Sequence, residues 1–306
     1  MRTIVTGGAG FIGSHVADAL IKAGHEVLVI DDLSRGKPEN VNAKAELARL
    51  AITSPEAEQV ISEYRPEAVF HHAAQIDVRH SVADPVHDSI VNVSGTVRIA
   101  SSASRAGCGA FILASTGGAI YGEQETYPAD ETHVTKSESP YGVSKLCGEV
   151  YLGYFQRTFG MRCVALRYAN VYGPRQDPHG EAGVVAIFAQ KMLSGESPMI
   201  HGDGEQTRDY VFVDDVARAN LLALANPHAR GAYNIGTGVE TSVITLAKHI
   251  AEAAGYEGEI RHGPAKLGEQ KRSVLDATRA KRELAWTATA SLADGLASTV
   301  RWFRGT

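Results

Sequence analysis

The sequence contains little cysteine, no excess of basic residues and no long apolar run. Its three cysteines, Cys108, Cys147 and Cys163, fit neither a metal-binding spacing nor a disulfide framework, which favours a reducing, cytoplasmic setting. No apolar segment is long enough to span a bilayer, and the chain opens directly into a strand-like segment without a signal peptide, so we expect no membrane partner. With 30 Lys and Arg against 35 Asp and Glu, the net charge of −5 argues against a nucleic-acid partner.

The composition is that of an ordinary globular protein, with 44% hydrophobic and 21% charged residues. Up to residue 168, strand-like and helix-like segments alternate. This alternation predicts a Rossmann-like, doubly wound parallel sheet of the α/β class with helices on both faces. The predicted strands are 2–6, 27–30, 68–74, 110–114 and 162–167, and the two longest predicted helices are 86–104 and 140–159.

A second lobe is predicted beyond Pro174, where the alternation is lost and short strands mix with short helices. We expect residues 1–168 to form the cofactor domain and residues 169–306 to form mainly a smaller, mixed α/β substrate lobe. Because residues 209–215 and 232–235 again resemble strands, residues 211–235 are expected to return to the first domain.

A glycine-rich turn follows the first predicted strand. Gly8, Gly10 and Gly13 fit the G-x-G-x-x-G spacing, and Gly7, Gly10 and Gly13 fit the wider G-x-x-G-x-x-G spacing. The first glycines allow the backbone to approach a pyrophosphate, and the last lets the next helix pack close to the strand with its amides directed at the phosphates. The residues of this turn predicted to contact a dinucleotide are Gly7, Gly10, Phe11, Ile12 and Gly13.

The second predicted strand ends in two aspartates, Asp31 and Asp32. A carboxylate roughly 20 residues past the glycines can accept hydrogen bonds from the adenosine ribose hydroxyls, and it repels a 2′-phosphate. The sequence therefore favours NAD over NADP. The alternative for Asp31 is a solvated carboxylate at a strand end.

Tyr141 and Lys145 lie four residues apart and therefore on one face of the predicted helix 140–159. A phenol with a pKa of roughly 10 is a poor base at neutral pH, but a nearby ammonium and an oxidised nicotinamide ring favour the phenolate. Tyr141 can then remove a proton from a sugar hydroxyl while a nicotinamide takes the hydride. Alone, the spacing is weak evidence, because ordinary amphipathic helices contain it; the glycine turn and Asp31 give it weight.

These features resemble the extended short-chain dehydrogenase/reductase superfamily and, within it, the UDP-glucose (UDP-galactose) 4-epimerase family. The resemblance covers essentially the whole chain and implies an NAD-dependent isomerase that interconverts UDP-glucose and UDP-galactose by transient oxidation at C4. Its later motifs are Asn170-Val-Tyr-Gly-Pro174, Gly202-Asp-Gly-x-x-x-Arg208-Asp-Tyr-Val-Phe-Val-Asp214, Tyr233-Asn-Ile-Gly236, and Gly268-Glu269 before Lys281-Arg-Glu-Leu-Ala-Trp286.

The resemblance also implies a catalytic hydroxyl after the strand that precedes the Tyr141 helix. Ser115 and Thr116 both qualify and we favour Thr116, which relays the proton between O4 and Tyr141 or steadies the O4 oxygen. The alternative for Thr116 is a strand-end cap. Besides the glycine turn and the two aspartates, the resemblance implies cofactor contacts for Ile52, Ala73, Ala74, Gln75, Asn92, Ser115, Tyr141, Lys145 and Tyr168.

Rotation of a keto sugar during the reaction requires a diphosphate anchor that is distant from C4. Arg208 is the best candidate, because the donor fork of a guanidinium matches phosphate geometry; the alternative is a salt bridge with Asp209 or Asp214. Asn170 resembles the residue that contacts the diphosphate and sugar, Glu269 resembles the acid near the uridine ribose, and Tyr210 is expected to face the nucleotide. The implied substrate contacts are Thr116, Tyr141, Asn170, Val184, Arg208, Tyr210, Lys266, Glu269 and Ser273.

The chain departs from the family pattern at two positions, and a third position bears on the substrate. Ala51 replaces an aspartate that often contacts adenine, and Lys266 replaces a second diphosphate arginine, keeping the charge but not the bidentate geometry. Ser273 is small where some members place a tyrosine that crowds the hexose 2-position. This implies turnover of UDP-GlcNAc and UDP-GalNAc as well, unless the loop simply packs differently.

Two other classes of function stay open. Related nucleotide-sugar 4,6-dehydratases carry an Asp-Glu pair, and UDP-glucuronate decarboxylases a Glu, where this chain has Gly117 and Gly118, which offer no acid or base for a second step. A 4-ketoreductase would show net redox. A non-catalytic NAD-binding sensor is the other class, but such relatives commonly lose the Tyr or the Lys. The resemblance also implies a homodimer formed by helix 140–159 and the helix that contains Asn92.

Overall fold

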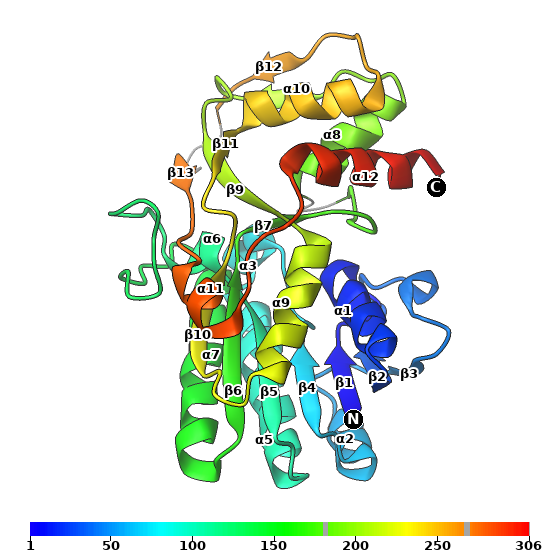
Figure 1. Ribbon diagram of the computed structural model, residues 1–306, viewed down its shortest axis with the longest axis vertical. Helices are drawn as coiled ribbons and strands as arrows, with labels where there is room; N and C mark the ends of the chain where they lie inside the picture. Colours follow the sequence, from blue (N-terminus) through cyan, green and yellow to red (C-terminus); the bar gives the residue numbers. More distant parts are fainter. Residues whose placement is uncertain (180–182, 266–269, 306) are drawn as a thin grey trace.

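The computed structural model describes residues 1–179, 183–265 and 270–305, which form two stacked lobes (Figure 1). The larger lobe contains a seven-stranded parallel sheet in the order β10-β6-β5-β4-β1-β2-β3. The predicted Rossmann-like α/β fold is therefore confirmed. The strands of this sheet are β1 (Arg2–Thr6), β2 (Glu26–Asp31), β3 (Glu46–Arg49), β4 (Ala68–His71), β5 (Ala110–Thr116), β6 (Arg162–Tyr168) and β10 (Gly231–Ile235).

Helices cover both faces of this sheet because alternate strand residues point to opposite sides. In β1, Val5 packs in the layer of α1 (Phe11–Lys22) and α9 (Val213–Ala225), whereas its neighbour Ile4 packs in the other layer. That other layer contains α2 (Pro55–Tyr64), α5 (Thr96–Arg105) and α7 (Pro140–Phe159). Both faces are thus apolar, which explains why these strands read as nearly continuous hydrophobic runs.

The strand order reverses between β1 and β4, and the carboxyl ends of the strands point toward the second lobe (Figure 1). In open α/β sheets, ligands bind in the crevice outside the carboxyl ends at this reversal. The segments that follow β1, β4, β5 and β6 carry most of the predicted site residues, so the topology brings them to one edge of the sheet.

The second lobe is built on a four-stranded sheet and three long helices. β9 (Thr207–Phe212) pairs with β7 (Asn170–Tyr172), β11 (Glu240–Ser242) and β13 (Arg272–Ser273), while β8 (Met199–His201) pairs with β12 (Arg261–Gly263). The helices are α8 (Val184–Leu193), α10 (Val243–Ala254) and α12 (Leu292–Gly305). None of the described helices has a stretch long and apolar enough to cross a membrane.

Two sequence-based expectations are corrected here. Residues 209–215 resembled a strand of the first domain, but β9 belongs to the second sheet, and the strand that joins β6 is β10. The expected helix 86–104 is interrupted: α4 (Pro85–Ser89) passes into a π-helix, η2 (Ile90–Gly95), before α5 begins. Strand-like patterns do not specify a partner, and the π-helix rearranges the hydrogen bonds around Asn92 without a Pro or Gly to mark its start.

Candidate active site

The glycine turn between β1 and α1 is packed too closely for side chains. Gly7 has φ +69°, and a Cβ placed there would lie 2.6 Å from the Ala73 amide nitrogen. At Gly13, a Cβ would lie 2.2 Å from the Gly7 carbonyl oxygen. No side chain caps the start of α1, whose first amides are therefore available to an anion such as a pyrophosphate. The turn fits the diphosphate of a dinucleotide.

Asp31 is almost wholly buried against the same turn. Its carboxylate accepts hydrogen bonds from the Ala9 amide (3.0 Å) and the Leu33 amide (2.9 Å), and burial raises its pKa. Each oxygen has a second lone pair, so the carboxylate can still accept from a ribose hydroxyl. Asp32 is exposed and binds the amide and hydroxyl of Ser34. Of the two predicted aspartates, Asp31 is therefore the one placed for a nucleotide.

Hydrogen bonds fix the segment that follows β4. The Ala73 amide donates to the Thr6 hydroxyl, and Gln75 and Asn92 exchange two hydrogen bonds, from the Gln75 amide to Asn92 Oδ1 and from Asn92 Nδ2 to the Gln75 carbonyl. Asn92 is buried in the π-helix η2. The predicted cofactor segment Ala73–Gln75 thus lies beside the glycine turn. Ile52 is buried under η2, since a Cβ at Gly95 would lie 2.8 Å from Ile52 Cδ1.

Tyr141 and Lys145 lie in the first turns of α7, whose N-cap is Ser139. The Lys145 ammonium donates to the Ala114 carbonyl at the end of β5 (3.0 Å) and lies 5.8 Å from the centre of the Tyr141 ring. Burial lowers the pKa of Lys145 to about 8 and raises that of Tyr141 above the value of a free phenol. Burial therefore opposes the phenolate that the neighbouring ammonium favours, and the expected help from an oxidised nicotinamide ring stays a prediction.

The two candidate hydroxyls after β5 face different surroundings. Ser115 is buried and donates to Glu149 (2.6 Å), which also forms an ion pair with Arg167 (2.7 Å). Thr116 is partly exposed and caps α6 (Gly117–Ile120) by accepting from the Ala119 amide (3.2 Å). An accepting hydroxyl retains its own proton for donation. Thr116 is thus a cap, as the alternative had it, and its hydroxyl can still donate a hydrogen bond, whereas the Ser115 hydroxyl is used inside the protein.

Gly117 and Gly118 differ in the space around them. A Cβ at Gly117 would lie 2.4 Å from a methyl group of Leu275, so no acidic side chain fits there without repacking. At Gly118 the nearest atoms are Asn170 Oδ1 (3.9 Å) and Thr116 Oγ1 (4.0 Å). Thr116 and Asn170 thus flank an open position on α6, which packs against α7.

On the second lobe, Arg208 lies in β9 between β11 and β13, and its register partner in β13 is Ser273. The acids considered as partners for Arg208 bind elsewhere: Asp209 accepts from the Thr237 and Gly238 amides, and Asp214 lies 3.2 Å from His15. Arg208 itself donates to the Thr207 carbonyl.

The remaining predicted contacts divide between packed and undescribed residues. Tyr210 was expected to face the nucleotide but is 6% exposed and packs edge-on against Tyr172 in the core of the second lobe. Tyr168 is buried and accepts a hydrogen bond from Asn220 (2.9 Å). Val184 begins α8 and packs against the same core as Tyr210. The predicted contacts Lys266 and Glu269 lie outside the described residues.

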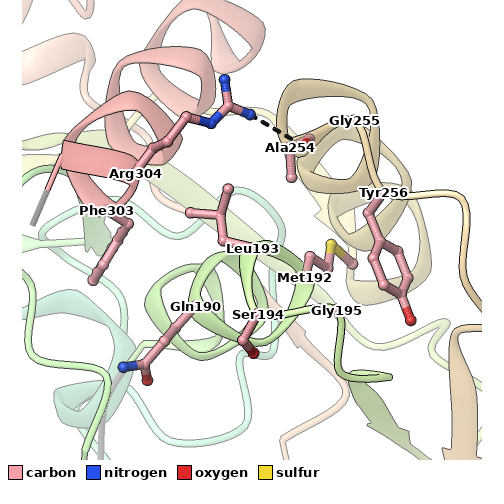
Figure 2. A pocket seen from close by; sticks show the side chains of 10 residues that line it. All are labelled: Gln190, Met192, Leu193, Ser194, Gly195, Ala254, Gly255, Tyr256, Phe303 and Arg304. Atoms are coloured by element: carbon pink, nitrogen blue, oxygen red, sulfur yellow. Dashed lines mark hydrogen bonds between the residues drawn. The ribbon is translucent and has the colours of Figure 1, made fainter.

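A pocket of about 630 Å³ lies elsewhere, at the C-terminal ends of α8, α10 and α12 (Figure 2). Its described lining contains none of the predicted site residues. Arg304 crosses one side and donates to the Ala254 carbonyl (3.1 Å), so this side of the pocket is closed by a contact between α12 and α10. The pocket is therefore separate from the site at the edge of the central sheet.

The structure adds two residues that no local pattern indicated. Asp88 on α4 is fully buried and accepts hydrogen bonds from Gln75, Asn92 and Ser144. Gln124, in the loop after α6, is 5% exposed and accepts from the Val274 amide (3.1 Å), which ties this loop to the segment after β13. Apart from Asn92, which lies four residues from Asp88, their partners are more distant in sequence, so only the assembled fold reveals them.

The fold and the site define an NAD-binding enzyme of the extended short-chain type. Residues 3–236 match the NAD dependent epimerase/dehydratase family, and the chain belongs to this family. It is 46% identical to the UDP-glucose 4-epimerase of Mycolicibacterium smegmatis, with 99% of each chain covered. The crystal structure of a UDP-glucose 4-epimerase from Thermotoga maritima with UDP-glucose has a TM-score of 0.97 and 49% identity, covering 100% of this chain and 99% of that one. That of the Thermus thermophilus UDP-glucose 4-epimerase with NAD has a TM-score of 0.94 and 43% identity, with the same coverage.

Proposed function

We propose that the protein is an NAD-dependent UDP-hexose 4-epimerase that interconverts UDP-glucose and UDP-galactose by transient oxidation at C4. The observation that carries this proposal is the combination of two features. Lys145 lies beside the Tyr141 ring on α7, which suits a proton transfer, and the position after Thr116 carries Gly117 and Gly118, which supply no acid or base for eliminating water. The similarity to UDP-glucose 4-epimerases over the whole chain supports the same reaction.

The residues present fit NAD. The close-packed glycine turn and the uncapped start of α1 suit its diphosphate, and Asp31 suits a ribose with free hydroxyls. We assign its binding to the lobe of residues 1–168 and 211–235, and that of the nucleotide sugar mainly to residues 169–306. When bound, NAD supplies a hydride acceptor that later acts as the hydride donor.

The chain's own residues handle the proton and orient the sugar. Tyr141 Oη accepts the O4 proton and later returns it, and Thr116 Oγ1 donates a hydrogen bond to O4 as negative charge develops there. A phenol whose pKa is raised by burial needs positive charge nearby to act as a base; the Lys145 ammonium provides part of it. Arg208 holds the diphosphate while the sugar turns its other face to the site.

Proton NMR of the anomeric signals tests the proposal directly. Purified protein incubated with NAD and UDP-galactose is expected to produce UDP-glucose without an added reductant. Loss of the C6 hydroxymethyl signals would instead identify a dehydratase. If the sugar stays unchanged while the protein binds NAD, a non-catalytic sensor becomes the better interpretation.

The sugar range is proposed to include UDP-GlcNAc and UDP-GalNAc, because Ser273 is small. It is 3% exposed in β13, beside Arg208 in β9, so a larger side chain there must enter the space next to the nucleotide-binding strand. Ser273→Tyr is expected to lower the rate for UDP-GlcNAc at least about 10-fold relative to UDP-glucose, the effect of crowding a pocket by roughly 1–3 kcal/mol. Relative rates of both sugars in both proteins check this. An unchanged ratio contradicts a role for Ser273 in selecting the sugar.

A homodimer in the cytoplasm is also proposed. Five apolar side chains along α7 are exposed by 43% to 65%, and Val82, Val86 and Ile90 are exposed on α3, α4 and η2, which contact α7. Single exposed apolar residues are common, but several on adjoining elements favour an interface. The five residues of α7 are Val143, Val150, Tyr151, Tyr154 and Phe159.

The dimer proposal predicts that Val150→Asp shifts the protein to monomers. A charge at the centre of an apolar interface costs several kcal/mol unless it is paired, whereas the same charge at an exposed site elsewhere costs little. Sedimentation velocity of the wild type, of this variant and of the control Val239→Asp, which alters an exposed valine of the second lobe, checks this. A monomeric wild type removes the proposal.

A further inference from the structure

Asp88 is a buried carboxylate at the junction of three elements of the site. Its Oδ1 accepts from Gln75 Nε2 (3.0 Å), which follows β4, and from Asn92 Nδ2 (2.9 Å) in η2. Its Oδ2 accepts from the Ser144 hydroxyl (2.6 Å), which lies on α7 between Tyr141 and Lys145. A single side chain thus connects the segment assigned to the cofactor with the catalytic helix.

The hydrogen bonds of Asp88 come from neutral groups. An asparagine could make the same three contacts, since Ser144 can accept as well as donate. No ion pair joins Asp88 to a cation among residues 1–179, 183–265 and 270–305. Burying such a charge costs free energy, and the charge acts strongly on nearby ionisable groups because little water screens it. Hydrogen bonding alone therefore does not explain why this position carries a carboxylate.

The charge of Asp88 acts on the ionisable side chains of Tyr141 and Lys145. Burial raises the pKa of Tyr141, and the charge of Asp88 raises it further by opposing the phenolate. Burial lowers the pKa of Lys145 to about 8, and Asp88 and Glu149 both oppose that shift by favouring the ammonium.

Other charged or titratable groups surround the pair, but they differ from Asp88. Glu149 is paired with Arg167, and burial holds the pKa of both His71 and His72 far below the ordinary value, so these imidazoles are neutral. The remaining such groups on the elements packed against α7 are Arg79 and His80 on α3 (Val78–Ala83), His87 on α4, Arg98 and Arg105 on α5, Arg162, Cys163 and Tyr168 on β6, and Tyr233 on β10.

We propose that Asp88 is a positioning residue that sets the protonation of the catalytic pair: its charge holds the proton on Tyr141 and the ammonium on Lys145, while its hydrogen bonds join Gln75 and Asn92 to α7. The catalytic part of this inference rests on the proposed epimerase function. In this arrangement Tyr141 gives up its proton only when further positive charge, such as an oxidised nicotinamide ring, lies nearby. Loss of the proton is thereby limited to protein with its cofactor bound.

Asp88→Asn tests the charge while keeping the contacts. The amide oxygen can accept from Gln75 and Asn92, and the amide nitrogen can donate to Ser144. Without the negative charge, the phenolate is no longer opposed and the ammonium is no longer favoured. The acidic limb of the pH profile of kcat/KM reports the deprotonation of Tyr141, and the basic limb reports the loss of the Lys145 ammonium. We therefore expect both limbs to move about one unit to lower pH. The control Ser144→Ala removes a hydrogen bond but no charge, and is expected to lower kcat/KM without moving either limb.

A second readout does not depend on turnover. In protein labelled with ¹³C at lysine Cε, the Lys145 signal, assigned with Lys145→Met, is expected to titrate near pH 8 and about one unit lower in Asp88→Asn. If the asparagine variant does not fold, Asp88→Ser, which is also neutral, replaces it. Unchanged titration of Lys145 overturns the inference. A shifted titration in a protein without epimerase activity supports the charge effect and rejects the proposed function instead.

Discussion

Replacing Tyr141 with phenylalanine is expected to lower the rate of UDP-galactose conversion by about 10³-fold, the range typical of losing a positioned acid or base. The phenol oxygen is the group that exchanges a proton with O4, and phenylalanine has none. The ring itself and its contacts within α7 remain, so the fold and the binding of NAD should be preserved. The measurement is the anomeric proton signal over time, with NAD binding followed by calorimetry on the same preparation.

Tyr151→Phe is the matched control for this experiment. It removes the same oxygen from the same helix, but Tyr151 is 43% exposed and lies outside the site, on the surface that we assign to the dimer. We expect wild-type turnover from this variant. A Tyr141→Phe protein that turns over like wild type rules out Tyr141 as the base. If the wild type and the Tyr141→Phe protein both bind NAD and both leave the sugar unchanged, the protein is a sensor.

Gly13→Ala is expected to abolish NAD binding. The new methyl group would lie 2.2 Å from the Gly7 carbonyl oxygen and 2.8 Å from its carbon, and backbone atoms cannot move aside as a flexible side chain can. The glycine turn must open, so its amides lose the arrangement that suits a pyrophosphate. Overpacking of this kind costs about 1–3 kcal/mol, so the melting temperature should also fall.

Gly109→Ala separates the local effect from a general cost of replacing glycine. Gly109 is exposed, and the nearest atom to a Cβ there is the Glu67 carbonyl oxygen at 3.6 Å, an ordinary contact. Calorimetric titration with NAD and thermal unfolding of both variants are the measurements. We expect Gly109→Ala to bind NAD like wild type. Normal NAD affinity in Gly13→Ala contradicts the role assigned to the turn.

Local patterns predicted the central sheet because its strands are defined by burial along the chain. The strands near residues 2–6, 27–30, 110–114 and 162–167 lie where the sequence placed them, within one or two residues. Parallel strands covered on both faces are apolar on both faces, so each is recognisable without knowledge of its neighbours. The strand at 207–212 was recognised too, but its assignment to a sheet was wrong.

The glycine turn, Asp31, and the Tyr141–Lys145 pair could be found from the sequence because each depends on a fixed spacing within one turn or helix. The choice between Ser115 and Thr116 could not be made in this way. It depends on Glu149, which lies 34 residues away and engages the Ser115 hydroxyl. Side chains of adjacent strand residues point to opposite faces, and only the packing of α7 identifies the face that is already occupied.

The sequence by itself determined the fold class and indicated the cofactor, since these follow from short-range spacing and from which residues are apolar, and its motifs carried the resemblance to the family. The tertiary structure decided the surroundings of the pair. The sequence indicated only that Lys145 lies next to Tyr141, whereas burial and the charge of Asp88 raise the pKa of Tyr141 in the folded protein. Desolvation and long-range charge depend on what surrounds a group in space, and the elements around α7 come from distant parts of the chain.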